Sequence, residues 1–168
     1  MQTKIKPPIV FLFTAFLFAI AANAQTENKY TSSLRLAVQK LSKAEFERDS
    51  AAFFSLIDSN IAITRRGETK NVGEDFDGFK KGRTAMFRAT SPKITTSFQI
   101  EEVKAGSTDP VWAGYDKGTF FYKEESENGK ADRRLTGPYY RAWKLVNGQW
   151  KCYLIVFMAF TCEGNGCN

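Results

Sequence analysis

The feature that most constrains the fold of this chain is a series of four long runs with strand character in its C-terminal half. Turn-rich segments separate these runs, and the dipeptide Asn147-Gly148 is a strong signal for a tight hairpin. Runs of 11 to 15 residues are much longer than a typical strand, so the sheet is expected to curl strongly or to contain bulges. The runs follow Pro92 and cover residues 93–103, 111–123, 132–146 and 149–160.

The N-terminal half has helical periodicity instead. Apolar residues recur at helical spacing from about residue 30 to 48, and Asp49 or Ser50 can cap a second, short helix over 51–57. Residues 60–65 alternate like a strand. These patterns predict one α+β domain in which helices come before most of the sheet.

A turn at residues 66–68 leads to a third helical stretch, expected from about residue 73 to 88. Asn71 and Glu74 have the spacing of a capping box, with Asn in place of the usual Ser or Thr. Acidic residues near the start of this stretch and basic residues near its end match the helix dipole. Gly82 weakens the pattern and predicts a break in the helix.

The first 24 residues have the three parts of a secretory signal peptide. Lys4 and Lys6 form the positive start, residues 9–20 are an apolar run, and Ala22-Asn23-Ala24 has the form of a cleavage site. The run is shorter than the about 20 residues that span a bilayer, so no stable membrane anchor is expected, with an uncleaved anchor as the alternative. We therefore expect a periplasmic or secreted protein with a signal peptide over 1–24, one domain over 25–160 and a Cys-containing tail over 161–168.

The three cysteines lie in or after the last strand-like run. An oxidising compartment permits one disulfide among three possible pairings. Cys162 and Cys167 flank a glycine-rich loop, so their pairing is favoured, whereas Cys152 lies inside a strand pattern and is expected to be a buried thiol. A ring this small should add little stability.

The composition excludes several classes of function. The chain has no histidine, which excludes a Ser-His-Asp or Cys-His catalytic system and a histidine-ligated metal. The net charge is +6, yet the cations are scattered rather than gathered in a stripe with exposed aromatic residues, so nucleic acid is not an expected partner. The sequence has no phosphate loop, metal-ligand cluster or nucleophile elbow, so no cofactor or metal is expected.

Several short motifs follow one another in a distinctive order. They are E-R-D-S-A-A-F-F-S-L-I-D at 47–58, the R-R-G turn, I-E-E-V at 100–103, W-A-G-Y at 112–115 and G-P-Y-Y-R-A-W-K-L-V-N-G-Q-W-K at 137–151. Their order and spacing resemble the nuclear transport factor two-like superfamily, in its branch of small SnoaL-like and ketosteroid-isomerase-like domains. The resemblance implies an α+β fold with a cone-shaped, curved antiparallel sheet wrapped around three N-terminal helices and one open, mostly apolar pocket. It also implies a homodimer through the sheet, but no particular reaction.

In the isomerase-like enzymes of that superfamily, a carboxylate base lies at the end of the first strand. The matching positions here are Thr64, Arg65 and Arg66, so the resemblance does not extend to that base. Arg65 could instead hold an anionic group at the pocket mouth, because a planar guanidinium pairs well with carboxylates. The alternative is a solvated arginine pair beside a turn.

Glu45 is the first candidate for catalysis. It continues the apolar stripe of Leu34, Val38 and Leu41 toward the core, and a carboxylate in an apolar pocket could act as an acid or a base. If Glu45 is buried in this way, its replacement by Gln should keep or raise stability near neutral pH. The alternative is that it lies at a helix end where the face is already wet.

The densest polar and aromatic group lies on the strand-like runs. Asp116 is the second catalytic candidate, and Tyr115, Tyr139, Arg141 and Trp143 are candidate ligand-binding residues. Strand alternation puts Tyr115 and Asp116 on opposite faces, and it puts Tyr139, Arg141 and Trp143 on one shared face. One face should line the pocket, but the pattern does not say which. The alternative is that these residues pack at a sheet or dimer face.

Two functions from different classes follow from these patterns. The first is an exported pocket domain that binds a small apolar or weakly acidic ligand and forms a homodimer. The second is a cofactor-free lyase, isomerase or hydrolase that uses Glu45 or Asp116 with a tyrosine. The two differ in whether a carboxylate and a tyrosine hydroxyl converge within hydrogen-bond reach inside the cone.

Overall fold

A computed structural model describes residues 28–65, 68–90, 92–106, 113–126 and 132–167 of the chain. The expected signal peptide lies outside these residues. Within them, three α-helices and a short 3-10 helix lie in the N-terminal half, and a seven-stranded sheet is completed by the C-terminal half. The elements are α2 (Lys29–Glu47), α3 (Ser50–Leu56), β1 (Ile57–Arg65), β2 (Glu68–Asn71), η1 (Val72–Asp75), α4 (Phe76–Arg88), β3 (Lys93–Ala105), β4 (Ala113–Glu125), β5 (Asp132–Val146), β6 (Gln149–Phe157) and β7 (Thr161–Glu163).

Local side-chain chemistry defines the first two helices. The side chain of Asn28 accepts a hydrogen bond from the Tyr30 amide and begins α2. Arg48 ends α2 in the left-handed conformation, and its guanidinium donates to the carbonyls of Met86 and Ala89, which ties this corner to the end of α4. Asp49 caps α3 through a 3.0 Å bond from the Ala52 amide, as the sequence predicted.

The third helix differs from the sequence-based expectation in two ways. The predicted break near Gly82 is wrong, because α4 runs without interruption to Arg88 and its apolar residues hold it against the rest of the fold. The predicted capping box is also wrong in its detail. Asn71 caps only the 3-10 turn, through the Gly73 amide, and Asp75 caps α4 through a 2.9 Å bond from the Gly78 amide.

The sheet has the strand order β2-β1-β6-β5-β4-β3, with β7 paired to β5. All pairings are antiparallel except that of β1 with β6. The predicted length of the strands is confirmed, since β3 and β4 have 13 residues and β5 has 15. Bulges lie at Glu101 in β3 and at Tyr153 in β6, where Tyr153 is the extra residue opposite Ala142 and Trp143 of β5. The predicted hairpin is confirmed, with Asn147 and Gly148 at φ values of 50° and 77°.

The expected strand over 149–160 ends earlier, at Phe157, and two further short strands, β2 and β7, were not expected. The chain leaves β6 after Phe157 and returns as β7 beside the lower part of β5, so the expected tail contributes to the sheet. Residues 68–71, which begin at the last residue of the expected turn, form β2 on β1. Both short strands are too brief for a clear alternation pattern.

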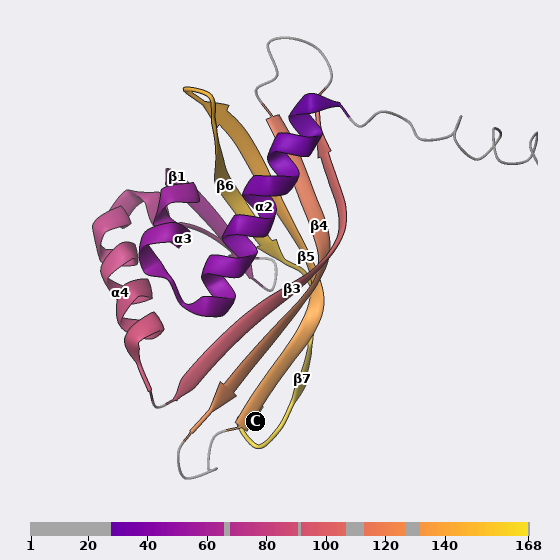
Figure 1. Cartoon of the computed structure of the whole chain (residues 1–168). Helices are drawn as coiled ribbons and strands as arrows, with labels where there is room; N and C mark the ends of the chain where they lie inside the picture. Colours follow the sequence, from indigo (N-terminus) through magenta and orange to yellow (C-terminus); the bar gives the residue numbers. More distant parts are fainter. Residues whose placement is uncertain (1–27, 66–67, 91, 107–112, 127–131, 168) are drawn as a thin grey trace, which may run out of the picture.

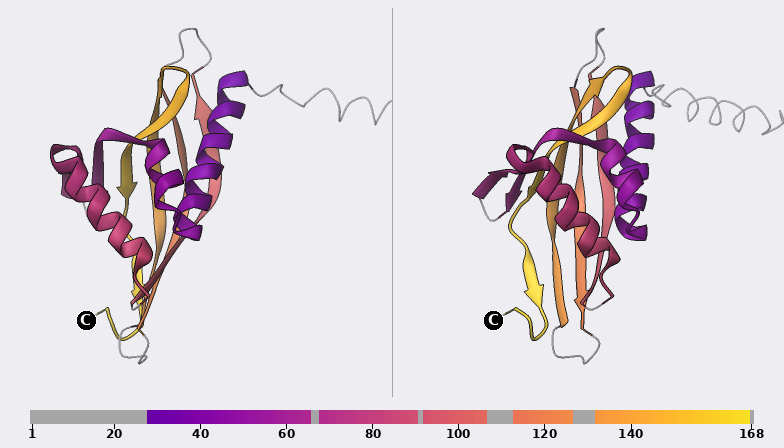
Figure 2. Two further views of the ribbon diagram at one scale, coloured as in Figure 1. Left: turned by 60° about the vertical axis from the view of Figure 1, so that its left-hand side comes forward. Right: turned by 90° about the vertical axis from the view of Figure 1, so that its left-hand side faces the viewer.

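The helices cover the concave face of the curved sheet. In Figure 1, α2 lies along this face, and α4 stands on the other side of α3. Figure 2 shows that α4 and the sheet converge where α4 leads into β3 and diverge toward the other end, which gives the cone shape. No helix of the described part is long and apolar enough to cross a membrane.

The core lies between α2 and the upper half of the sheet. Leu34, Val38 and Leu41 of α2 are completely buried, as are Trp143 on β5 and Cys152 on β6. Burial raises the pKa of the Cys152 thiol, and Cys152 is the one free cysteine, while Cys162 and Cys167 form the predicted disulfide.

Candidate functional site

A cavity of about 540 Å³ opens on the concave side, between α4 and the lower half of the sheet. Its walls are mainly aliphatic and aromatic, which is typical of sites for small organic molecules. The apolar wall consists of Phe53, Ile63, Phe79, Met86, Phe120, Leu135, Ile155, Phe157 and Phe160. Three arginines and one carboxylate supply its charged groups: Arg65, Arg83, Arg133 and Glu45.

Glu45 lies in this cavity wall, and its partner is Arg83. The Glu45 side chain is 6% exposed, and its Oε1 accepts a bond from Nη2 of Arg83 on α4. The Arg83 guanidinium also lies over the rings of Phe53 and Phe87, at 5.2 and 4.9 Å. Glu45 is therefore buried, as its position on the α2 stripe predicted, but it is held as one half of an ion pair.

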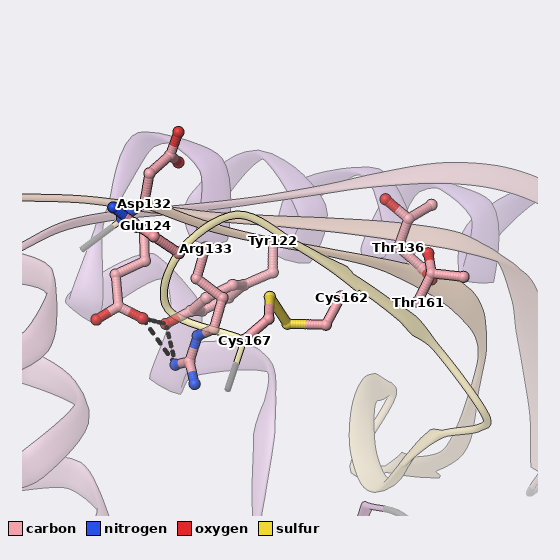
Figure 3. The surroundings of a disulfide bond; sticks show 9 residues. Tyr122, Glu124, Asp132, Arg133, Thr136, Thr161, Cys162 and Cys167 are labelled. Atoms are coloured by element: carbon pink, nitrogen blue, oxygen red, sulfur yellow. Dashed lines mark hydrogen bonds and ion pairs between the residues drawn. A yellow bond between two sulfur atoms is a disulfide. The ribbon is translucent and has the colours of Figure 1, made fainter. Parts of the chain in front are cut away.

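Arg133 is also paired. Its Nη2 donates to Glu124 at 2.7 Å and to the Tyr122 hydroxyl at 3.5 Å, and its guanidinium lies over the Tyr122 ring. Figure 3 shows these three side chains beside the disulfide of Cys162 and Cys167. Burial raises the pKa of Tyr122, so this hydroxyl stays protonated at neutral pH.

Arg65 differs from the other two arginines. Among the residues that the structure describes, no carboxylate forms an ion pair with it. The residue as a whole is exposed, yet its guanidinium lies 5.5 Å from the centre of the Phe157 ring and lines the cavity. Burial of this group, followed by the nearby charge of Arg83, lowers the pKa of Arg65. Arg65 thus presents a partly desolvated positive charge to the cavity.

Asp116, Tyr139, Arg141 and Trp143 form a second cluster on the same concave face. Asp116 accepts bonds from the Tyr139 hydroxyl at 2.8 Å and from the Trp143 indole at 2.6 Å. The Arg141 guanidinium donates to both carboxylate oxygens and also to the Ser42 hydroxyl. All four of the clustered side chains are at most 1% exposed, and none of them lines the cavity.

The charges within this cluster compensate one another. Burial alone would lower the pKa of Arg141, but the Asp116 carboxylate raises it overall. Burial, and then the Asp116 charge, raise the pKa of Tyr139 above its ordinary value, although the Arg141 charge opposes this. Arg141 therefore stays charged and Tyr139 stays neutral across the neutral pH range, which suits a structural role.

Tyr115 lies on the opposite face of the sheet from the cavity. Its hydroxyl donates to Glu102 at 2.7 Å, and its ring stacks on Tyr140 with 5.6 Å between centroids. The structure therefore divides the candidates predicted from sequence into three groups. Glu45 and Arg65 line the cavity, Asp116, Tyr139, Arg141 and Trp143 form the buried cluster, and Tyr115 lies on the outer face.

A tyrosine and a carboxylate do converge, but outside the cavity. Tyr139 and Asp116 are in contact, yet both are buried beyond the reach of a ligand in the described cavity. Of the lining residues, Tyr122 donates to Glu124, which does not itself line the cavity, and Glu45 is bound by Arg83. No pair of an accessible carboxylate and a tyrosine hydroxyl is present among the described lining residues.

Sequence reasoning missed Arg83, Arg133 and Tyr122. For Arg83 a signal was present, because Phe76, Phe79 and Arg83 follow the same i, i+3, i+7 spacing that drew attention to Glu45. Arg133 and Tyr122 lie near the ends of long strands, where alternation alone does not indicate what covers a face. In the described part of the chain, no group of three or more His, Cys, Asp or Glu side chains could hold a metal ion.

Solved structures resemble this arrangement, although no family model and no curated protein matches the sequence. A nuclear transport factor two-like superfamily protein from Salmonella enterica superposes with a TM-score of 0.57 at 8% identity, over 80% of this chain and 91% of its own. This chain has the nuclear transport factor two-like fold. A ketosteroid isomerase-like protein from Erwinia carotovora has a TM-score of 0.58 at 10% identity, over 78% and 96% of the two chains.

A third structure with the nuclear transport factor two-like fold is a protein of unknown function from Shewanella oneidensis. It has a TM-score of 0.56 at 12% identity and covers 77% of this chain and 98% of its own. Sequence identities this low support a shared fold only. The expected fold class and the superfamily resemblance are therefore confirmed at the level of structure, and function has to be argued from the cavity itself.

Proposed function

We propose that this protein is an exported ligand-binding domain whose cavity takes a small, mainly apolar molecule with one acidic group. The observation behind the proposal is the contrast among the cavity arginines. Arg83 and Arg133 each have a carboxylate partner, whereas Arg65 has none among the described residues. A ligand carboxylate would supply that partner and would also relieve the repulsion between Arg65 and Arg83.

The shape and lining of the cavity agree with this class of ligand. A volume of about 540 Å³ holds a molecule of one to three rings or an equivalent chain. Aromatic residues from α3, α4, β4 and β6, together with Phe160, would contact its apolar part. The enzyme alternative has less support, because Glu45 is bound to Arg83 and Asp116 is sealed in the core.

A matched pair of fluorescent probes tests the proposal. The probe 1-anilinonaphthalene-8-sulfonate is an apolar anion, and N-phenyl-1-naphthylamine has the same rings without the charge. The wild type should bind the anion at one site per chain. Changing Arg65→Met should weaken binding of the anion by about tenfold, with the neutral probe unaffected, because a charge-assisted bond is lost.

Arg134→Met is the control for the loss of one positive charge. Arg134 is next to a cavity residue on β5, but its side chain is 57% exposed and pairs with Asp132 outside the cavity. This variant should bind both probes like the wild type. The proposal is wrong if the wild type does not bind the anionic probe at one site per chain. It is also wrong if Arg65→Met and Arg134→Met bind the anionic probe with equal affinity.

Export and dimer formation are separate parts of the proposal. N-terminal sequencing of the protein from its host's culture medium or periplasm should begin at Gln25. A homodimer would use the outer face of the sheet, where Phe121 is 41% exposed on the same face as the stacked Tyr115 and Tyr140. Phe121→Glu should then lower the mass seen by light scattering, and Leu36→Glu, at an exposed position of α2, should not.

A further inference from the structure

The C-terminal segment after β6 is bound along β5. Strand β7 pairs with it in the register Thr136↔Thr161, Leu135↔Cys162 and Arg134↔Glu163. Beyond β7, the Gly166 amide donates to the Asp132 carbonyl at 3.2 Å, and the Asp132 amide donates to the Asn165 side chain at 2.8 Å. Figure 1 shows β7 beside the lower end of the sheet, far from the hairpin between β5 and β6.

Glycines allow the close approach of this segment at both of its ends. A Cβ at Gly137 would lie 2.7 Å from Cβ of Phe160 and 2.8 Å from the Ala159 carbonyl oxygen. Gly164 has φ 107°, and a Cβ there would lie 2.1 Å from the carbonyl oxygen of Asp132. The segment can therefore lie on β5 only because neither position has a side chain.

The same segment forms one wall of the cavity. Phe160, Cys162, Gly166 and Cys167 all line it, and the Phe160 ring packs against Phe120 of β4, with 6.0 Å between ring centroids. The disulfide lies beside Tyr122 and Arg133, which are themselves lining residues (Figure 3). A ligand that fills the cavity would thus touch the disulfide loop, residues 160–167.

The Cys162–Cys167 bond holds the part of the loop that lies beyond β7. Without the bond, the last residues would depend on a few exposed hydrogen bonds, and chain ends held in this way fray. A frayed wall has to be ordered when a ligand binds, and that ordering weakens affinity. The fold itself would persist, because no residue of the loop belongs to the buried core.

We propose that the disulfide loop is a ligand-contacting wall of the cavity and that opening the Cys162–Cys167 bond weakens ligand binding without unfolding the domain. This inference rests on the proposed ligand-binding function. A phosphine reductant can open the bond. The phosphine supplies two electrons, the S–S bond breaks, each sulfur takes a proton, and water provides the oxygen of the phosphine oxide.

The test compares oxidised and phosphine-reduced protein with the probe 1-anilinonaphthalene-8-sulfonate. Reduction of the wild type should weaken binding by about tenfold, and the double variant Cys162→Ser/Cys167→Ser should bind as weakly as the reduced wild type. The double variant should not respond to the reductant. Cys152→Ser should keep the response, because Cys152 is a free thiol outside the cavity wall.

A second test displaces the loop by a substitution that changes no cysteine. Gly164→Ala should weaken probe binding, because the new methyl group would collide with the Asp132 carbonyl. Gly148→Ala is the matched control, since Gly148 also has positive φ but nothing lies within 4 Å of its Cβ position. Circular dichroism checks that each variant is folded.

The outcomes separate the two proposals. If the oxidised wild type binds the probe and reduction leaves its affinity unchanged, the loop inference is overturned while ligand binding stands. If the oxidised wild type does not bind the probe, the proposed function itself fails. If reduction removes the circular dichroism of the folded domain, the bond stabilises the fold rather than the site, and the inference is also overturned.

Discussion

Two clusters of arginine and aromatic side chains lie on the concave face of one sheet, and they differ in what covers them. The upper cluster is the buried group of Asp116, Tyr139, Arg141 and Trp143. In it, Arg141 is completely buried under α2 and has Asp116 as its partner. The lower cluster is the cavity wall with Arg65, Arg83 and Arg133. In it, Arg65 faces an open cavity and has no carboxylate partner among the described residues. The same residue types therefore form a closed structural ion pair in one place and an open, positively charged site in the other.

The comparison shows that structural and functional polar groups in this fold differ in whether their charges have partners within the protein. A buried charge is tolerated when its hydrogen bonds are provided within the protein, and Asp116 receives bonds from three neighbouring side chains. An unpaired charge beside apolar walls has no such internal compensation, so a ligand can provide it. A carboxylate and a tyrosine in contact, such as Asp116 and Tyr139, do not by themselves indicate a ligand-binding or catalytic site.

The largest effect is expected for Asp116→Asn, which removes the charge that compensates Arg141. The free energy of unfolding should fall by about 3–5 kcal/mol, because Arg141 would remain as an uncompensated buried charge. Urea denaturation measures this change. Glu47→Gln is the control, since Glu47 pairs with Lys43 at the surface and its loss should cost less than about 0.5 kcal/mol. Wild-type stability in Asp116→Asn would contradict the assignment of the upper cluster as structural.

A smaller loss is expected for Glu45→Gln at the edge of the cavity. The sequence alone suggested that this change would keep or raise stability, and the Arg83 partner removes the basis for that expectation. The loss of one charged partner should lower the free energy of unfolding by about 1–3 kcal/mol near neutral pH. A double-mutant cycle with Arg83→Met measures the coupling between the two residues. A more stable Glu45→Gln variant would restore the first expectation.

The buried Cys152 thiol predicts a loss of stability at alkaline pH. Burial raises the pKa of Cys152, so the unfolded chain loses the thiol proton at a lower pH than the folded chain does. The stabilisation is complete below the ordinary thiol pKa of about 8.5 and should fall by about 2 kcal/mol by pH 10. Urea denaturation from pH 7 to 10 follows this slope. In Cys152→Ala the slope should be shallower, and an equal slope would show that Cys152 does not cause it.

The smallest effect on stability is expected for Arg65→Met. The free energy of unfolding should change by no more than about 0.5 kcal/mol, with a slight gain, because the repulsion from Arg83 is removed. The gain should shrink at high salt, which screens the two charges. Thermal unfolding at low and high ionic strength measures it. A large loss of stability would mean that Arg65 has a structural role like that of Arg141.

Local patterns in the sequence determined much of this protein. Helical spacing predicted α2 and α3, Asn147-Gly148 predicted the hairpin, and the glycine-rich spacing of Cys162 and Cys167 favoured the disulfide that the structure contains. These features depend on neighbours a few residues apart, so the sequence states them directly. The stripe on α2 likewise predicted that Glu45 faces inward, and it does.

Only the tertiary structure decided which inward-facing groups form a site. Strand alternation placed Tyr139, Arg141 and Trp143 on one face, but it could not say that α2 would seal them in together with Asp116. It also could not pair Glu45 with Arg83, because these residues lie 38 positions apart on different helices. The charge of a buried group depends on what packs against it across the fold, and that information is not local in the chain.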